Sequence, residues 1–346
     1  MESPKKDIRS LSKEALETFF VEQGIPAFKG NQAYQWLWQK GVHSFDEMTN
    51  LSLAHRTLLA SHFTINHIRI DRQQRSSDGT IKNAVELHDG YIVESVLIPT
   101  SKRSTACVSS QVGCSLDCVF CATASLKRIR NLNPDEIYDQ VVSINRQSQF
   151  YYERPLTNIV FMGMGEPLMN YNNVLLAIEK ITDPKGLGMS PKRITLSTSG
   201  VPKMIRKLAE DKVRFKLAVS LHSARQEIRE TIMPFAKNFK LQDLQEALLF
   251  WYAQTKSRIT FEYVVWKGVN DQLEDIHALI QWCKRIPSKV NIIQYNPIDA
   301  ASMQQANPEV IQNYITALEE AKIKVTYRRS RGVDIDAACG QLANKI

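Results

Sequence analysis

From about residue 104 onward, short β-like runs alternate with helical stretches, and this alternation constrains the fold more than any other feature. The predicted helices span residues 134–149, 171–182, 201–210, 243–254, 272–285 and 308–321. Strands that alternate with helices favour a parallel sheet with right-handed crossovers. We therefore predict an α/β fold, with a last β-like run, Lys324–Arg329, at one edge. The six predicted strands are Ala106–Ser110, Asn158–Met162, Arg193–Ser197, Phe215–Ser220, Ile259–Val265 and Val290–Tyr295.

The first hundred residues show two other patterns. In residues 1–62 apolar residues recur at helical spacing, which predicts a small helical domain. Residues 63–99 contain β-rich runs separated by Asp78-Gly79 and Asp89-Gly90, dipeptides that favour antiparallel hairpins. We therefore divide the chain into a helical accessory domain at 1–62, an antiparallel β extension at 63–99 and an α/β core at 100–346.

Composition narrows the class of protein. No apolar run approaches the roughly 18 residues of a membrane helix, and residues 1–7 lack the apolar segment of a secretory signal. We expect a cytoplasmic protein without membrane partners, in which cysteines stay reduced. The net charge of +8 suits a polyanionic partner. We interpret the basic runs at 127–130 and 328–331 as phosphate contacts, with solvated surface arginines as the alternative.

Three cysteines, Cys114, Cys118 and Cys121, share one short loop with no fourth cysteine nearby. A structural zinc site takes four ligands, and an ordinary iron–sulfur cluster is held by four thiolates. Three thiolates leave one coordination position open for chemistry. The alternatives are half of a zinc site or three unliganded core cysteines.

Glycines and polar residues follow the predicted strands directly. A Gly-Met-Gly-Glu-Pro run at 163–167 follows the second strand, and Ser197 ends the third. Ser220-Leu221-His222 ends the fourth strand and Asn296 follows the sixth. Functional residues of parallel barrels gather at the carboxyl ends of the strands. These residues are therefore predicted to meet the cysteine loop.

The cysteine spacing resembles the CxxxCxxC loop of radical S-adenosylmethionine (SAM) enzymes. The resemblance implies a partial (β/α)6 barrel over residues 104–300. It also implies a [4Fe–4S] cluster held by Cys114, Cys118 and Cys121, with SAM on the fourth iron. The run at 163–167 resembles the family's SAM-binding turn. The SAM contacts implied by position are Gly165, Glu166, Ser197, Ser220, Leu221, His222 and Asn296.

The C-terminal segment 329–342 resembles the tail of radical SAM RNA methyltransferases that modify adenine ring carbons. By this resemblance, one SAM methylates Cys339 and a second is cleaved to a 5′-deoxyadenosyl radical. That radical abstracts hydrogen from the methyl group, whose carbon then adds to the base. Cys107 resolves the protein–RNA adduct through a transient disulfide with Cys339. Glu94 occupies the position of the family's proton acceptor.

Residues 166–170 resemble the branch that methylates adenine C2. This implies action on an adenine of 23S rRNA and on the adenine beside the anticodon of tRNAs. A one-electron reductant such as a flavodoxin-type protein and a monomeric state are also expected. One departure stands out: Lys127-Arg128 replaces the family's usual glycine and aromatic residue, which puts that local turn in doubt.

Two alternative functions remain open. The related antibiotic-resistance branch methylates adenine C8, and it typically lacks the proline found here as Pro167. A basic RNA-binding protein with a purely structural metal site would bind zinc rather than iron and would not depend on Cys339.

Overall fold

The computed structural model describes residues 5–299 and 301–344, and a ten-stranded sheet forms the centre of this part of the chain. The strand order is β14-β13-β12-β11-β10-β9-β6-β5-β4-β3. From β6 to β14 every neighbouring pair is parallel, as the alternation predicted. These strands are β6 (Ser104–Cys107), β9 (Asn158–Phe161), β10 (Ile194–Thr198), β11 (Lys216–Ser220), β12 (Ile259–Val264), β13 (Ser288–Ile293) and β14 (Val325–Arg328).

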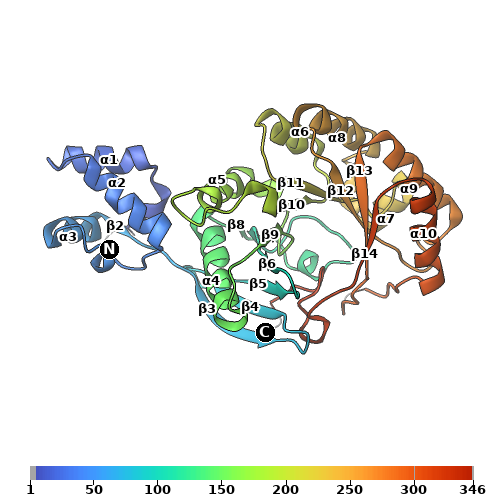
Figure 1. Ribbon diagram of the computed structural model, residues 1–346, viewed down its shortest axis with the longest axis horizontal. Helices are drawn as coiled ribbons and strands as arrows, with labels where there is room; N and C mark the ends of the chain where they lie inside the picture. The colour runs from blue at the N-terminus through green and yellow to red at the C-terminus, as the bar shows by residue number, and fades with distance from the viewer. Residues whose placement is uncertain (1–4, 300, 345–346) are drawn as a thin grey trace.

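Helices connect these strands and cover the outer face of the curved sheet (Figure 1). The prediction missed α7 (Gln226–Ile232), because so short and charged a segment shows little apolar periodicity. The six predicted helices are present as α4 (Pro134–Tyr152), α5 (Tyr171–Thr182), α6 (Pro202–Glu210), α8 (Leu241–Thr255), α9 (Leu273–Arg285) and α10 (Pro308–Glu320).

Alternation of side chains along the strands separates an apolar core from a polar interior. In β10, Ile194 and Leu196 are fully buried in the core. Thr195 and Ser197, between and after them, line cavities on the opposite face. Successive strand residues point to opposite faces of a sheet. The sheet therefore packs one face against the helices and surrounds a polar space with the other.

The antiparallel extension continues this sheet without a break. It consists of β3 (Arg69–Arg75), β4 (Ile81–Glu86) and β5 (Ile92–Pro99), and β5 pairs with β6. The predicted turns at Asp78-Gly79 and Asp89-Gly90 join the three strands. The last described residue, Asn344, lies beside these strands, where its side-chain amide donates to the Ile92 carbonyl at 2.9 Å (Figure 1).

The helical module contains α1 (Lys13–Glu22), α2 (Phe28–Gln35) and α3 (Leu53–His62), as predicted. The two ends of the module lie side by side, because β1 (Lys6–Asp7) pairs in parallel with β2 (Phe63–Thr64). Trp38 is buried with its ring edge-on to Tyr138 of α4. This tryptophan therefore packs the module onto the core.

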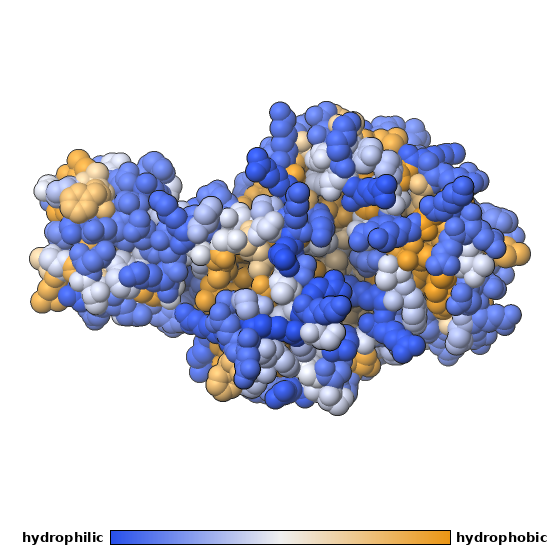
Figure 2. All heavy atoms as spheres, viewed as in Figure 1, coloured by the Kyte–Doolittle hydropathy of each residue, from blue (hydrophilic) through white to orange (hydrophobic). Residues whose placement is uncertain are grey.

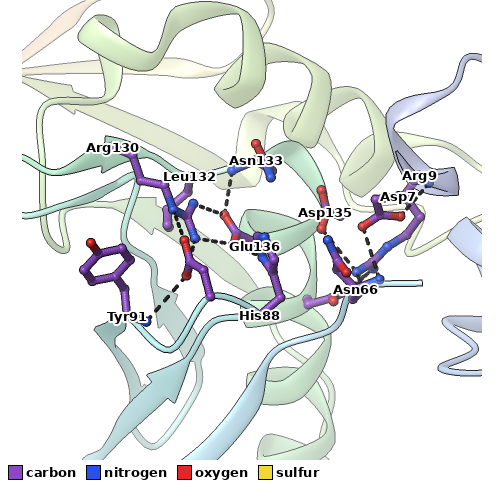
Figure 3. A network of polar contacts seen from close by, with 12 residues as sticks. Asp7, Arg9, Asn66, His88, Tyr91, Arg130, Leu132, Asn133, Asp135 and Glu136 are labelled. Atoms are coloured by element: carbon purple, nitrogen blue, oxygen red, sulfur yellow. Dashed lines mark hydrogen bonds and ion pairs between the residues drawn. The ribbon is translucent and has the colours of Figure 1, made fainter. Parts of the chain in front are cut away.

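Arg9 is the main polar link between this module and the core. Its Nη1 lies 2.9 Å from both carboxylate oxygens of Asp139, and its Nη2 lies 3.2 Å from Asp135 on the same helix. The guanidinium also donates to the backbone carbonyl of Asn66. Figure 3 shows Arg9 beside Asp135 at the start of α4. Burial raises the pKa of Asp135 to about 7 despite the nearby arginine.

A second network, also in Figure 3, corrects our interpretation of the first basic run. Arg130 does not extend toward solvent as a free phosphate contact. It forms ion pairs with Asp89, at 2.6 Å, and with Glu136, at 2.8 Å. A paired guanidinium is largely neutralised, so Arg130 instead fixes the segment after the cysteine loop to α4.

Among the described residues, no helix is both long enough and apolar enough to cross a membrane.

Candidate active site

The cysteine loop is shaped by backbone contacts between its start and the segment that follows it. Gly113 has φ +73°, and a Cβ there would overlap the backbone carbonyl of Lys127. The Cys114 amide donates to the Leu126 carbonyl at 3.0 Å. These contacts use only the main chain of residues 126 and 127. The unusual Lys127 side chain is therefore compatible with the turn.

Cys114, Cys118 and Cys121 line one cavity, as their spacing predicted. Burial raises the pKa of Cys114 to about 11 and that of Cys118 well above its ordinary value. Burial also raises the pKa of Cys121, and the sulfurs disfavour one another's charge. Three thiolates are thus unstable here unless a strongly positive group compensates them. An iron–sulfur cluster with three cysteine ligands satisfies this requirement.

No group of three or more His, Cys, Asp or Glu side chains in the described ranges is placed to ligate a single metal ion. Thiolates that bind three different irons of one cluster lie farther apart than ligands that share one ion. The three cysteines around one cavity therefore fit a cluster.

The glycine-rich turn forms the next part of the wall. Gly165 has φ +95°, and a Cβ there would lie 2.5 Å from the Gln111 Cβ. The Gln111 side chain accepts a hydrogen bond from the Glu166 amide at 2.8 Å. Sequence reasoning missed Gln111, which carries no motif signal, although it lies in β7 (Gln111–Val112) just before the cysteine loop.

The Glu166 carboxylate is held rigidly rather than left free. One oxygen accepts from the Leu168 amide at 3.0 Å and the other from the Ser199 amide at 2.7 Å. Burial raises the pKa of Glu166, and these hydrogen bonds act in the opposite direction. The side chain lines the cavity with its position fixed from two βα loops.

Most of the other predicted SAM contacts line the same cavity. Ser197, Ser220, His222 and Asn296 are in its wall, whereas Leu221 is fully buried and is not part of it. Burial, followed by the charge of Arg229, lowers the pKa of His222 to about 3. His222 is therefore neutral, and its Nδ1 accepts from the Val264 amide at 3.2 Å, which leaves the proton on Nε2.

Cys339 lies where two cavities meet. It lines the cavity of the three cysteines and also a neighbouring cavity of about 640 Å³ that contains Cys107. Both thiols are free. Burial, and then the nearby Cys339 sulfur, raises the pKa of Cys107 to about 12. The structure thus brings together two cysteines that are distant in the sequence, as the predicted disulfide exchange requires.

The larger cavity is strongly cationic and lies on the inner face of the sheet. Arg328, at the end of β14, lines both cavities, and the Cys339 sulfur is the main influence that raises its pKa. Figure 2 shows a hollow in the core, rimmed mainly by hydrophilic side chains. The basic residues around the larger cavity are Arg103, Lys216, Lys289, Lys324, Arg328, Arg329 and Arg331.

Sequence reasoning also missed Glu262, a buried carboxylate in the middle of β12 that lines both cavities. Its Oε1 accepts from Asn291 at 2.9 Å, and its Oε2 has no hydrogen-bond partner in the described part of the protein. Burial raises its pKa, while Arg328 acts in the opposite direction. Only its inward register on the strand could have indicated this position.

Glu94 lies outside the walls of both cavities. Its fully buried carboxylate lies 3.3 Å from the Lys82 ammonium. One oxygen also accepts from the backbone amides of Ala343 and Asn344, at 2.8 and 3.1 Å. The structure therefore brings Glu94 to the tail that carries Cys339 rather than into the open cavity.

Comparison with known proteins agrees with this geometry. Residues 6–65 match the model of the ribosomal RNA large subunit methyltransferase N-terminal domain, and residues 108–283 match that of the radical SAM superfamily. A crystal structure of a radical SAM methyltransferase from Sphaerobacter thermophilus superposes with a TM-score of 0.90 at 36% identity. It covers 97% of this chain and 99% of its own.

Relatives of assigned function extend over nearly the whole chain. A protein of Christiangramia forsetii, described as a probable dual-specificity RNA methyltransferase RlmN, is 67% identical over 99% of this chain and 97% of its own length. The dual-specificity RNA methyltransferase RlmN of Nitratidesulfovibrio vulgaris is 43% identical over 97% of this chain and 94% of its own. The chain therefore belongs to the RlmN family of radical SAM RNA methyltransferases.

Proposed function

We propose that this enzyme methylates C2 of a specific adenine in 23S rRNA and C2 of the adenine beside the anticodon in tRNAs. The observation that carries the proposal is the position of Cys339 in the wall shared by two cavities. One cavity has the three clustered cysteines, and the other has Cys107 and a cationic rim. A methyl group on Cys339 would therefore lie between the proposed radical-generating centre and a space suited to a nucleotide.

Cys114, Cys118 and Cys121 would hold a [4Fe–4S] cluster, and the wall formed by Gly165, Glu166 and the strand-end polar residues would hold SAM. When bound, these groups supply reductive cleavage of SAM and hence the radical that activates a methyl carbon. Neither Glu166 nor the neutral His222 side chain adds a positive charge to this cavity. Their fixed hydrogen bonds keep the wall in one geometry.

Cys339 serves as the methyl carrier because its side chain is accessible from both cavities. Its sulfur first takes a methyl group from SAM by displacement, and its methyl carbon later bonds to the adenine ring. Covalent catalysis of this kind divides one difficult step into easier ones. The adduct then loses the ring proton and returns one electron to the redox partner that supplied it. The Cys107 thiolate attacks the Cys339 sulfur, the bond between that sulfur and the methylene carbon breaks, and the carbon takes up a proton to leave as the methyl group of the base. Two electrons must then reduce the Cys107–Cys339 disulfide. Glu94 remains a predicted proton acceptor, and its contacts with the tail are considered below.

The cationic cavity would hold the phosphates flanking a splayed-out adenine, because C2 is not reachable in a paired stem. We propose that residues 1–62 grip the folded RNA, that 63–99 and 100–346 form the extension and the catalytic core, and that the enzyme acts as a cytoplasmic monomer. A flavodoxin-type protein or a similar one-electron donor completes the proposed system.

Trapping of the covalent adduct tests this proposal. The Cys107→Ala variant, purified without oxygen, is expected to accumulate a protein–RNA species, because product release fails. Cys283→Ala is the matched control, since Cys283 is buried away from both cavities and should turn over normally. Normal turnover by Cys107→Ala would refute the mechanism. Mass spectrometry of nucleosides should show 2-methyladenosine, and 8-methyladenosine would indicate the C8 alternative.

A further inference from the structure

Glu94 makes a set of contacts that a free proton acceptor does not need. Its side chain is 0% exposed, and its Oε2 accepts hydrogen bonds from two consecutive backbone amides, those of Ala343 and Asn344. These amides follow Cys339 by only a few residues. A carboxylate in this position fixes the main chain of the tail directly.

Lys82 compensates the charge that this contact requires. It is 1% exposed and lies 3.3 Å from the other carboxylate oxygen, Oε1, which makes no hydrogen bond in the described structure. Lys82 and Glu94 come from neighbouring strands, β4 and β5. Burial of two charges is expensive, and replacement of such a pair by apolar residues is often neutral or stabilising, so stability does not explain this one. The pair thus presents one anionic oxygen to the tail at a defined position.

Other contacts continue this attachment on both sides of the carrier cysteine. The Thr123 hydroxyl donates to the Leu342 carbonyl at 2.6 Å, and the Asn296 side-chain amide donates to the Cys339 carbonyl at 3.1 Å. Before Cys339, Asp334 accepts from the Ser76 hydroxyl at 2.5 Å. The tail is therefore fixed to the β3–β4 turn at one end and to Glu94 at the other.

We propose that the buried Lys82–Glu94 pair is a latch that positions Cys339 by holding the backbone of residues 343–344. Glu94 is then a positioning residue, and its Oε2 is occupied for as long as the tail is docked. The latch itself stands on these contacts alone, whereas its catalytic consequence rests on the proposed role of Cys339 as methyl carrier.

Two double variants isolate the acceptor oxygen. Lys82→Met/Glu94→Gln removes both charges but keeps an amide oxygen for the tail. Lys82→Met/Glu94→Met removes the charges and the acceptor together. Neither variant leaves a lone buried charge, and thermal unfolding checks that both are folded. Hydrogen–deuterium exchange of peptides covering residues 338–344 then reports on the latch without any cofactor.

The latch predicts that the methionine variant exchanges the Ala343 and Asn344 amides on the order of tenfold faster than wild type. The glutamine variant should remain close to wild type. Unchanged protection in the methionine variant would overturn the proposal.

Intact-mass measurement with SAM separates positioning from proton transfer. A positioning role predicts that methylated Cys339 is depleted in the methionine variant and largely retained in the glutamine variant. Methylation of Cys339 precedes the proton transfer, so this difference cannot come from a lost proton acceptor. Equal levels of methylated Cys339 in the two variants would show that the acceptor oxygen does not position the carrier, and the assignment as a positioning residue would then be wrong. A wild-type enzyme that never methylates Cys339 would refute the proposed function, and the exchange result would still decide the latch.

Discussion

Substitution of Arg9 by leucine should weaken the attachment of the helical module to the core in a pH-dependent way. Arg9 is 5% exposed and contacts Asp139 and Asp135 at 2.9 and 3.2 Å. Removal of one partner from a buried ion pair costs roughly 3–5 kcal/mol, because the remaining charge is buried without compensation. We therefore expect Arg9→Leu to lose about 3 kcal/mol of stability at pH 8.

The loss should be smaller in mildly acidic solution. The pKa of Asp135 in the folded protein is already raised to about 7, mainly by burial, and Arg9 acts to lower it. Without Arg9 this pKa rises further. Between pH 8 and pH 6 the folded carboxyl of the variant is then protonated to a greater extent than that of the wild type, whereas the unfolded carboxyl, with a pKa near 4, stays ionised in both. Stability rises with falling pH wherever the folded state binds more protons.

Thermal unfolding of both proteins at pH 6, 7 and 8 measures this difference. The variant Arg9→Met/Asp135→Asn/Asp139→Asn is the control, since it removes both carboxylates that contact the guanidinium and should recover most of the lost stability. The Asp7 carboxylate, which also interacts with Arg9, remains and keeps its hydrogen bonds from the backbone amides of Arg9 and Asn66. Gel-shift measurements with tRNA at the same pH values show whether the variant still binds RNA with wild-type affinity. A deficit that is the same at pH 6 and pH 8, or no deficit at all, would refute the reasoning.

Three further predictions concern the active site. Gly165→Ala should cost about 2–4 kcal/mol of stability, because it combines a positive φ with a clash against Gln111. Titration with SAM should also show weaker binding, and wild-type affinity would count against this account of the turn. Glu166→Gln should lower the free energy of unfolding by about 1–3 kcal/mol, because one of the two backbone amides that donate to the carboxylate would then face an NH₂ group. Urea unfolding measures this loss, and a smaller loss would show that one of the two hydrogen bonds is dispensable. Cys107 should resist alkylation by iodoacetamide at pH 8, because burial raises its pKa to about 12. Mass spectrometry should show that alkylation accelerates as the pH rises toward 10. Rapid labelling at pH 7 would contradict the assigned burial.

Local patterns were sufficient to predict most of the secondary structure. The helix predicted at 134–149 begins at Pro134 as α4, and a capping box between Asn133 and Glu136 marks its start. The first strand was placed late, at residues 106–110, whereas β6 spans Ser104–Cys107. The ladders of β6 with β5 and with β9 both end at Cys107, although β5 and β9 themselves continue past this point, and no local pattern records where the pairing stops.

Charge patterns were less informative than cysteine spacing. Arg130 and Arg331 looked like phosphate contacts, but Arg130 pairs with Asp89 and Glu136, and Arg331 donates to the Pro99 carbonyl and pairs with Asp78. In the sequence, an arginine that pairs with a carboxylate of the protein looks the same as one that binds a phosphate. Its partner is decided by which segments the fold brings beside it.

The sequence by itself determined the three-cysteine loop, the strand-end residues and the family. These features are local, and the parallel connections bring the carboxyl ends of successive strands to one edge of the sheet. Only the tertiary structure decided that Cys339 lies between two cavities with Cys107 in one of them. Only it decided that Glu94 binds the amide of Ala343, 249 residues away. Such contacts depend on the path of the tail across the sheet. That path is set by tertiary packing between distant segments, so local sequence patterns do not predict it.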